Sequence, residues 1–461
     1  MVDTERVMMI EHLKAQFPAG PKGMPILGVV SKISKQGMVD FYYNVWKEYG
    51  DIAHMMAGPL HQFLLVRPDD IHHVMVKNAD NYMKLTSHAK LRAILGNGLL
   101  PTEGDTLWRR QRKLMQPTYT PNGIRQFADI MVDAGEQLTA KWHQKYADGK
   151  PFDLNLAMLE VTMSIISRSM FGIDISDDFA ETGHALIELL EYVSNTASSI
   201  FDVPLFVPTR RNVRVKQAKE HIDAYIMGII QTRRKEGLGN DLLSMLMSAK
   251  DEETGEMMTD EQLRDEVLIT FFAGHETTAS MLTWLYYFLA QHPADEQKLH
   301  EELASVLGGK RPTLEDLSSL KYTRMLMDET LRLRSPVFIT VRDAIEDDVI
   351  AGYTVPKGSM VLIYPFGTHR HPDYWERPDE FYPDHFLPEV ANERPRYAYY
   401  PFGAGPRICI GNHFALMEGA ILIATISQAF RIRIQNTHEI GLKSVGVLKP
   451  SEPIIATVEA R

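Results

Sequence analysis

Cysteine is almost missing from this sequence, which has one, Cys409, among its 461 residues. An internal disulfide is therefore excluded, and the chain suits a reducing compartment such as the cytoplasm. Long apolar runs are missing as well, because the stretch at residues 7–10 is too short for a signal-peptide core or a membrane span. These absences predict a soluble, cytoplasmic protein without a membrane anchor.

A basic excess is also lacking. The chain has 49 lysines and arginines against 60 aspartates and glutamates, a net charge of −11. This balance argues against nucleic-acid binding, which needs a concentrated basic surface for the phosphates. Internal repeats, low-complexity tracts and long Gly/Ser linkers are missing too. We therefore expect residues 1–461 to form a single domain, with residues 1–28 as an N-terminal extension and proline-rich hinge.

The remaining composition is that of a globular protein, with 44% hydrophobic and 24% charged residues. Most of the chain has a helical pattern. Strands are expected in two places: a hairpin at residues 52–66 that turns at Gly58-Pro59, and two strands within residues 349–363 that are joined by a turn at Pro356-Lys357-Gly358. The sequence therefore predicts a mainly α fold with few strands.

The clearest helix is expected from Thr259 to Gln291. Thr259 and Gln262 have the spacing of a capping box, and Pro293 ends the helix. Inside it, residues 273–278 read Ala-Gly-His-Glu-Thr-Thr, which weakens a helix. The hydroxyl of Thr277 can bond to the carbonyl four residues earlier and loosen the ladder there. Taken alone, this string predicts equally well a tolerated polar kink or a space for a small ligand.

Cys409 lies in a glycine-rich loop, residues 402–411 (Phe-Gly-Ala-Gly-Pro-Arg-Ile-Cys-Ile-Gly), which leads into an apolar helical stretch. Glycine N–H groups, the positive end of a helix and nearby Arg407 all stabilise a thiolate. A lone cysteine without such a context is most often a small buried hydrophobe. This string, however, matches Phe-x-x-Gly-x-Arg-x-Cys-x-Gly at every specified position. It resembles the haem-binding loop of the cytochrome P450 family, in which a cysteine thiolate ligates the haem iron.

The resemblance implies a cytochrome P450 fold, mainly α, with a large helical bundle around haem and small peripheral β-sheets. It implies haem b as the cofactor and Cys409 as the ligand of the iron. Phe402, Arg407 and Gly411 of the same loop would bind the cofactor. The string at 273–278 is similar to the family's oxygen-activating motif, which makes Glu276 and Thr277 the acid and the alcohol that deliver protons.

Three arginines match family positions that contact haem propionates. Trp108 and Arg112 are four residues apart and share a helix face, as in the family helix that contacts a propionate. Arg342 and Arg407 match two further positions. Each arginine alone is more often a solvated surface charge. The basic residues at 109, 110 and 113 predict either a patch for an acidic electron carrier or an ordinary helix surface, and both readings stay open.

Glu329 and Arg332 have the spacing of the family's Glu-x-x-Arg signature, a structural lock near the haem. An arginine in a downstream Pro-x-Arg-Phe string normally completes this lock. Here the string is Pro-Asp-His-Phe, so His385 stands in its place. Because histidine is shorter and only partly charged near neutral pH, we expect the lock to loosen on the alkaline side.

The family resemblance also implies a mostly apolar substrate pocket, made of Phe271, Phe272, Ala273, Val337, Phe338, Ile339, Val445 and Gly446. We therefore expect a monooxygenase that inserts one atom of dioxygen into a small lipophilic substrate such as a fatty acid, terpenoid or steroid. The chain ends soon after the Cys409 region, so electrons are expected from a separate ferredoxin or flavodoxin with its NAD(P)H reductase. The alternatives are a peroxide-driven peroxygenase, which would usually lack the Glu276-Thr277 pair, and a non-enzymatic haem sensor or carrier.

Overall fold

The computed structural model describes residues 16–84, 89–102, 106–172, 182–198, 203 and 205–461. The chain forms two compact units. The first comprises residues 1–88, 338–378 and 394–408, and the second comprises residues 89–337, 379–393 and 409–461. The first part of the expected N-terminal extension, residues 1–15, lies outside the described residues. Among the helices described, none has both the length and the apolar character needed to cross a membrane.

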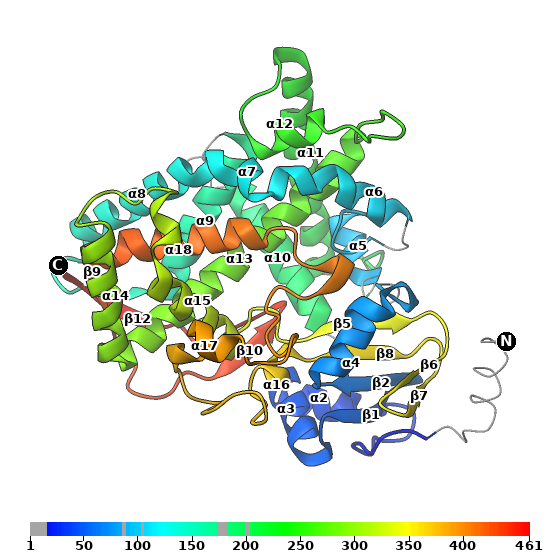
Figure 1. Ribbon diagram of the computed structural model, residues 1–461. Coiled ribbons are helices and arrows are strands. Elements are labelled where there is room, and N and C mark those ends of the chain that lie inside the picture. The colour runs from blue at the N-terminus through cyan, green and yellow to red at the C-terminus, as the bar shows by residue number, and fades with distance from the viewer. Residues whose placement is uncertain (1–15, 85–88, 103–105, 173–181, 199–202, 204) are drawn as a thin grey trace. The chain divides into compact units, whose positions relative to one another are not determined.

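A five-stranded sheet organises the first unit, in the order β1-β2-β8-β5-β3 (Figure 1). Its strands are β1 (Ile52–Ala57), β2 (Leu60–Leu65), β3 (Tyr82–Met83), β5 (Thr340–Ala344) and β8 (Met360–Ile363). β1 and β2 pair antiparallel up to Ala57 and Leu60, which confirms the hairpin predicted around Gly58-Pro59. β2 and β8 are parallel, although some 300 residues separate Phe63 from its partner Val361. The sheet therefore joins two segments of the unit that lie far apart in the sequence.

The prediction for residues 349–363 is partly wrong, because three strands form there and not two. β6 (Asp348–Ile350) pairs with β7 (Tyr353–Val355), while β8 joins the larger sheet. The β6–β7 turn lies at Ala351-Gly352, where both residues have positive φ, 50° and 84°. Pro-Lys-Gly at 356–358 instead connects β7 to β8, which do not pair with each other. The long-range pairing of β8 with β2 and β5 decides this arrangement, and local turn signals do not reveal it.

Side chains from the sheet and from the segment before Cys409 share one core in the first unit. Phe63, Ile71, Val361, Tyr400 and Ala404 belong to it and are almost completely buried. Helices of this unit flank the sheet and are α2 (Val30–Gln36), α3 (Met38–Tyr49), α4 (Pro68–His72), α16 (Pro365–Thr368), the π-helix η1 (His73–Lys77), and the 3₁₀-helices η2 (Ala79–Asn81) and η8 (Gly405–Arg407). The core thus anchors the loop that leads to Cys409.

The second unit is mainly helical. Its longer helices are α5 (Ala89–Leu95), α6 (Thr106–Met115), α8 (Ala128–Tyr146), α9 (Leu154–Phe171), α10 (Thr182–Ser198), α11 (Arg210–Glu236), α12 (Leu242–Ser248), α13 (Asp260–Gln291), α14 (Pro293–Val306), α15 (Lys321–Leu333) and α18 (Asn412–Ala429). Shorter turns are α7 (Pro121–Ile124), α17 (Pro388–Ala391), η4 (Gln116–Tyr119), η5 (Arg125–Phe127), η6 (Asp316–Ser318) and η7 (Pro383–Phe386). Its strands form two small sheets, β4 (Phe152–Asp153), β12 (Ile455–Ala460) and β9 (Phe430–Ile434), and β10 (Leu442–Val445) with β11 (Val447–Pro450). This composition confirms the predicted mainly α fold with small sheets.

The central helix of the second unit is α13. It begins after Thr259, whose side chain and that of Gln262 form both bonds of the predicted capping box, and it ends at Gln291 before Pro293. Most of its residues are buried, because α9, α15 and α18 all pack against it. The predicted helix boundaries are confirmed to within one residue.

Candidate active site

The glycine-rich loop is shaped by a close approach of two backbones in the first unit. Gly405 has φ of 66°, and an added Cβ would lie 1.8 Å from the carbonyl oxygen of Met75 in η1. Only glycine fits a position that is both left-handed and this crowded. Phe402 and Arg407 of this loop are half-buried. The glycine therefore sets the path of the chain just before Cys409.

Cys409 itself is exposed, and it is the first residue of the loop that belongs to the second unit. Two residues later, Gly411 is the N-cap of α18, so the sulfur lies beside the start of an 18-residue helix, where the helix dipole favours negative charge. Trp108 is buried on α6, four residues before the half-buried Arg112. Burial lowers the pKa of Arg112, and the charge of Cys409 acts in the opposite direction. Arg112 and Cys409 are therefore close enough to interact electrostatically.

The third predicted propionate ligand, Arg342, lies on β5 of the first unit and is only 5% exposed. Its Nη1 donates hydrogen bonds to two neutral oxygens, the carbonyl of Val341 at 2.8 Å and the hydroxyl of Thr340 at 3.3 Å. Burial lowers the pKa of Arg342 to about 10. In the part of the chain that the structure describes, no carboxylate hydrogen-bonds to this guanidinium. A buried cation of this kind calls for an anionic partner.

An open strip interrupts the buried surface of α13 at the predicted motif. Ala273 is exposed in the middle of the helix, and Phe272, Gly274, Glu276 and Thr277 are half-buried. An exposed alanine at the centre of such a helix indicates a space beside it. The predicted pocket residue Phe271 lies away from this strip, since it is buried and stacks on Phe171 of α9, with 5.3 Å between the ring centroids.

The bond predicted from the motif is present. The hydroxyl of Thr277 donates to the carbonyl oxygen of Ala273 at 2.8 Å, while α13 stays helical throughout. Because the hydroxyl proton is used in this bond, the lone pairs of the Thr277 oxygen can accept hydrogen bonds on the open strip. Glu276, the adjacent acid, has one buried carboxylate oxygen, Oε2, without a hydrogen-bond partner among the described residues.

Sequence reasoning missed two charged residues that adjoin this region. Lys449 of β11 binds the other carboxylate oxygen of Glu276, and nothing in the sequence links two residues that lie 173 positions apart. Glu418 of α18 is 1% exposed, and burial raises its pKa to about 8. An acidic residue inside the apolar stretch of α18 is a signal that could have revealed Glu418.

The predicted lock forms. Arg332 donates from Nε and Nη2 to the two carboxylate oxygens of Glu329, at 2.7 and 2.8 Å, and His385 Nδ1 lies 3.2 Å from Oε2 of the same group. All three side chains are at most 2% exposed. Burial alone would raise the pKa of Glu329, but the bonds from Arg332 and His385 outweigh it and lower the pKa. The substituted histidine therefore takes part in the lock.

The basic residues of α6 do not act as an isolated patch. Arg110 pairs with Glu256 at 2.9 Å, and Lys113 pairs with Glu253 at 3.1 Å and with Glu252 at 3.5 Å. The acidic segment at 252–256 thus offsets part of the positive charge. Of the two sequence-based alternatives, these ion pairs favour an ordinary helix surface.

The other predicted pocket residues are divided between the units. Val337 is 45% exposed in the second unit, whereas Phe338 and Ile339 belong to the first, where Phe338 is buried. Val445 and Gly446 form the tip of the β10–β11 hairpin, and Gly446 has φ of 76°. These assignments to a substrate pocket stay predictions.

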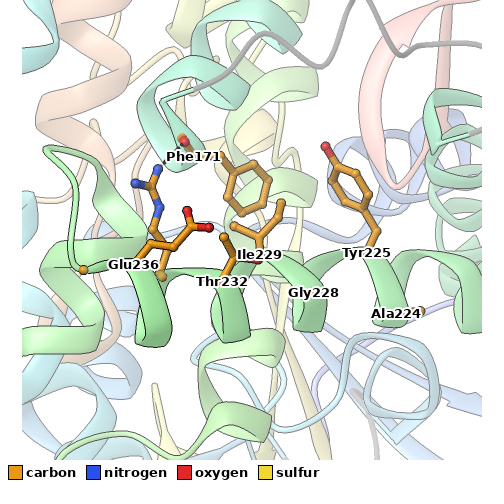
Figure 2. Close-up of a pocket in the computed structure, with 9 residues that line it drawn as sticks. Phe171, Ala224, Tyr225, Gly228, Ile229, Thr232 and Glu236 are labelled. Carbon is orange, nitrogen blue, oxygen red and sulfur yellow. Dashed lines mark hydrogen bonds between the residues drawn. The ribbon is translucent and has the colours of Figure 1, made fainter.

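A different pocket, of about 460 Å³, lies along α11 in the second unit (Figure 2). Phe171, Tyr225, Ile229 and Thr232 supply its mostly apolar walls, and Glu236 lies at one end. Its cation, Arg233, is already paired with Asp241 at 2.6 Å. None of the predicted site residues lines this pocket, so it is separate from the candidate active site.

Each unit, described by itself, offers groups of the kinds that bind haem. The first unit offers the buried Arg342, to which no carboxylate of the described residues bonds, and the loop residues Phe402 and Arg407. The second offers an exposed thiol with Arg112 in electrostatic reach and a helix surface left open at Ala273. Haem needs these groups: a thiolate for the iron, cations for the propionates and room over one face.

Comparison with known proteins agrees with the geometry. The family model described as "Cytochrome P450" matches residues 18–458, which include most of both units. Among similar proteins, cyclooctatin synthase of Streptomyces melanosporofaciens is 32% identical over 90% of this chain and 89% of its own. Putative cytochrome P450 132 of Mycobacterium tuberculosis is 32% identical over 84% of this chain and 85% of its own. Human cytochrome P450 3A5 is 30% identical over 96% and 91%.

A solved structure supports the same assignment. The crystal structure of the cytochrome P450DA heme domain superimposes with a TM-score of 0.88 and is 25% identical, covering 96% of this chain and 98% of that one. The predicted fold is thereby confirmed at the level of the family. The chain belongs to the cytochrome P450 family of oxidoreductases, and its cofactor is haem b.

Proposed function

We propose that this protein inserts one atom of dioxygen into a small lipophilic substrate, with electrons from a separate ferredoxin or flavodoxin and its NAD(P)H reductase. The observation that carries the proposal is the pair on the open strip of α13. The acid has a buried oxygen without a partner among the described residues, and the neighbouring alcohol donates its proton to the carbonyl of Ala273. A proton relay needs such a pair, and binding alone does not.

Several residues would hold the cofactor. Cys409 would ligate the iron, Arg112, Arg342 and Arg407 would bind the propionates together with Trp108, and Phe402 and Gly411 would also bind the cofactor. Bound haem supplies the binding of dioxygen and the cleavage of its O–O bond, which an axial thiolate favours. The protein's share is to place the group, screen it from water and deliver protons.

Proton delivery would depend on two side chains. Thr277 accepts a hydrogen bond at its Oγ1, because its own proton is committed to the Ala273 carbonyl. Glu276 would deliver the proton through Oε2, its buried oxygen without a hydrogen-bond partner among the described residues. Both act at fixed positions on a buried helix, which lowers the cost of reorganisation during the reaction.

The substrate class is supported by apolar residues and by relatives. Phe271, Phe272, Ala273, Val337 to Ile339, and Val445 with Gly446 are our candidates for the pocket. Two Streptomyces melanosporofaciens proteins similar to this chain are called cyclooctatin synthase and cyclooctat-9-en-7-ol 5-monooxygenase, at 32% and 30% identity. We therefore place a terpenoid first, ahead of a fatty acid or steroid. A cytoplasmic location belongs to the same proposal and is supported by the single cysteine.

The test is a spectral titration of the haem-loaded protein with dodecanoic acid, cyclooctat-9-en-7-ol and progesterone. A compound that displaces water from the iron shifts its spin state, and that compound then serves in turnover with surrogate ferredoxin and reductase. We expect NADPH-dependent product with the native protein and release of peroxide in place of product with Thr277→Ala. A Thr277→Ala protein that keeps the native coupling would contradict the relay. Turnover with hydrogen peroxide alone would favour a peroxygenase, and ligand binding without turnover would favour a sensor or carrier.

A further inference from the structure

The carboxylate of Glu276 meets one ammonium group within the second unit. Nζ of Lys449, on β11, donates to Oε1 of Glu276, and 2.5 Å separates the two atoms. Both side chains are largely withdrawn from water, with 12% of Glu276 and 24% of Lys449 exposed. An ion pair at this depth holds its members in one geometry far better than a solvated surface pair does.

The pair leaves the two oxygens of Glu276 in different surroundings. Oε1 is occupied by Lys449, whereas Oε2 is buried and has no hydrogen-bond partner among the residues that the structure describes. A buried oxygen of this kind is expected to bind a water molecule or another donor. Lys449 thus occupies one oxygen of Glu276 and leaves Oε2 as the one without a partner among the described residues.

A second bond fixes the register of β11 on α13. The hydroxyl of Ser280, one helical turn after Glu276, donates to the carbonyl oxygen of Leu448 at 2.8 Å. The N–H of Leu448 in turn donates to the carbonyl oxygen of Pro336, also at 2.8 Å. Because Leu448 directly precedes Lys449 in the strand, these two bonds hold the lysine opposite the acid.

The other titratable neighbour on α13 does not compete for this role. His275 is buried, and its Nδ1 donates to the carbonyl oxygen of Phe271 at 2.8 Å. Burial and the charge of Lys449 lower the pKa of His275. The bond to Phe271 and the charge of Glu276 raise it, but the net shift is downward. The histidine is therefore held in place as a neutral group, and Lys449 is the cation that contacts Glu276.

We propose that Lys449 is a positioning residue for proton delivery, which fixes Glu276 through Oε1 so that Oε2 stays in register with the Thr277 hydroxyl. The inference rests on the proposed function and deepens it. It also connects two parts of the site, since Lys449 follows the hairpin tip, Val445-Gly446, by three residues. A substrate that contacts the tip would act on the strand that carries the lysine.

The chain contains a matched control for this proposal. Lys443 on β10 is the register partner of Lys449 in the same hairpin, and it is exposed. Lys443→Met and Lys449→Met therefore remove the same charge from paired positions of the two strands. Only the second removes a bond to Glu276. Lys449→Arg keeps a cation of similar reach and serves as the conservative variant.

The first measurement is coupling in the haem-loaded enzyme, with whichever of dodecanoic acid, cyclooctat-9-en-7-ol or progesterone gives the largest spin-state shift. We expect Lys449→Met to lower the product formed per NADPH by roughly threefold or more, with a matching rise in peroxide, while the titration midpoint of the probe changes little. Lys449→Arg should restore most of the coupling, and Lys443→Met should leave it unchanged. Native coupling in Lys449→Met would overturn the proposal.

The second measurement needs no turnover. Urea unfolding of Lys449→Met, Glu276→Gln and the double variant forms a double-mutant cycle. We expect the midpoint shift caused by Lys449→Met to be at least halved in the Glu276→Gln background, and additive shifts would overturn the proposal. Failure of the proposed function would look different, because Glu276→Gln and Thr277→Ala would then both keep native coupling. If those two uncouple while Lys449→Met does not, only the role of Lys449 is wrong.

Discussion

The backbone N–H of Leu99 donates to Oε2 of Glu266 on α13, with 2.9 Å between the two atoms. The other oxygen of Glu266 is buried without a hydrogen-bond partner among the described residues. Burial raises the pKa of Glu266 from 4.5 to about 8. The folded protein therefore keeps this carboxyl protonated at neutral pH, and the neutral group ties the segment around Leu99 to the central helix.

Stability should consequently fall as the pH rises. The folded state holds the proton of Glu266 up to about pH 8, whereas the unfolded state releases it near pH 4.5. Between these values the loss of the proton stabilises the unfolded state, so the free energy of unfolding falls by at most about 5 kcal/mol for a shift of this size. We expect the urea unfolding free energy of the native protein to fall by several kcal/mol relative to Glu266→Gln from pH 5 to pH 8.

Glu261→Gln is the control for this experiment, because Glu261 is exposed on the first turn of the same helix. Its pH profile should parallel that of the native protein. If the profile of Glu266→Gln also runs parallel, the carboxyl is not protonated in the folded state.

Removing the cation of the buried lock should cost far more than removing an exposed cation from the same helix. Arg332→Met leaves the carboxylate of Glu329 buried with only His385 and backbone N–H partners, a loss of about 3–5 kcal/mol. Arg324→Met breaks the ion pair with Asp328, in which the arginine is 51% exposed, and should cost less than about 1 kcal/mol. Urea unfolding measures both, and equal costs would contradict a structural lock.

His385→Arg should keep the loading with haem and at least maintain thermal stability, because arginine occupies this position in the family's usual string. The native histidine contacts Glu329 through Nδ1, at 3.2 and 3.3 Å, whereas a guanidinium can donate two hydrogen bonds, one to each oxygen. Thermal unfolding and the haem absorbance per protein are the measurements. A large loss in either would show that the histidine has a role of its own.

Features that depend on local spacing could be predicted from the sequence. The capping box of Thr259 and Gln262, the Thr277 bond to Ala273, and the pairing of Glu329 with Arg332 each join residues three or four positions apart. Helical geometry fixes such distances, so the pattern alone suffices. The resemblance of the loop to the family motif then predicted that Cys409 ligates the haem iron.

Features that depend on long-range packing could not be predicted. Lys449 reaches Glu276 only because β11 docks on α13, and Gly405 meets Met75 across more than 300 residues of sequence. The turn at residues 356–358 forms as well, but β8 pairs with β2 and β5 and not with β7, which the turn signal could not show. In each case the tertiary contact decides, and a single sequence contains no periodic signal for it.

Gly405→Ala should destabilise the loop before Cys409. The new Cβ would lie 1.8 Å from the Met75 carbonyl oxygen at a φ of 66°, so both sterics and backbone conformation oppose it. We expect a loss of a few kcal/mol and weaker retention of haem, measured by urea unfolding and by haem loss to apomyoglobin. Gly228→Ala is the control: it lies within α11, where an added Cβ meets no described atom within 4 Å, and it should stabilise by about 0.5–1 kcal/mol. If Gly405→Ala and Gly228→Ala changed the free energy of unfolding equally, the backbone at Met75 would have to move away from the new Cβ at little cost.

Cys409→Ala should abolish the thiolate-type absorption of the reduced carbonyl complex. The chain has no second cysteine, so no other side chain can supply a thiolate. Thr277→Ala is the control, because it lies on α13 and leaves the sulfur intact, and it should keep the native spectrum while it loses coupling. The absorption of both variants is measured after reduction under carbon monoxide, at equal haem content. An unchanged spectrum in Cys409→Ala would show that another residue ligates the iron. Loss of the thiolate-type absorption in Cys409→Ala but not in Thr277→Ala would show that Cys409 is the ligand and that Thr277 acts only in proton delivery.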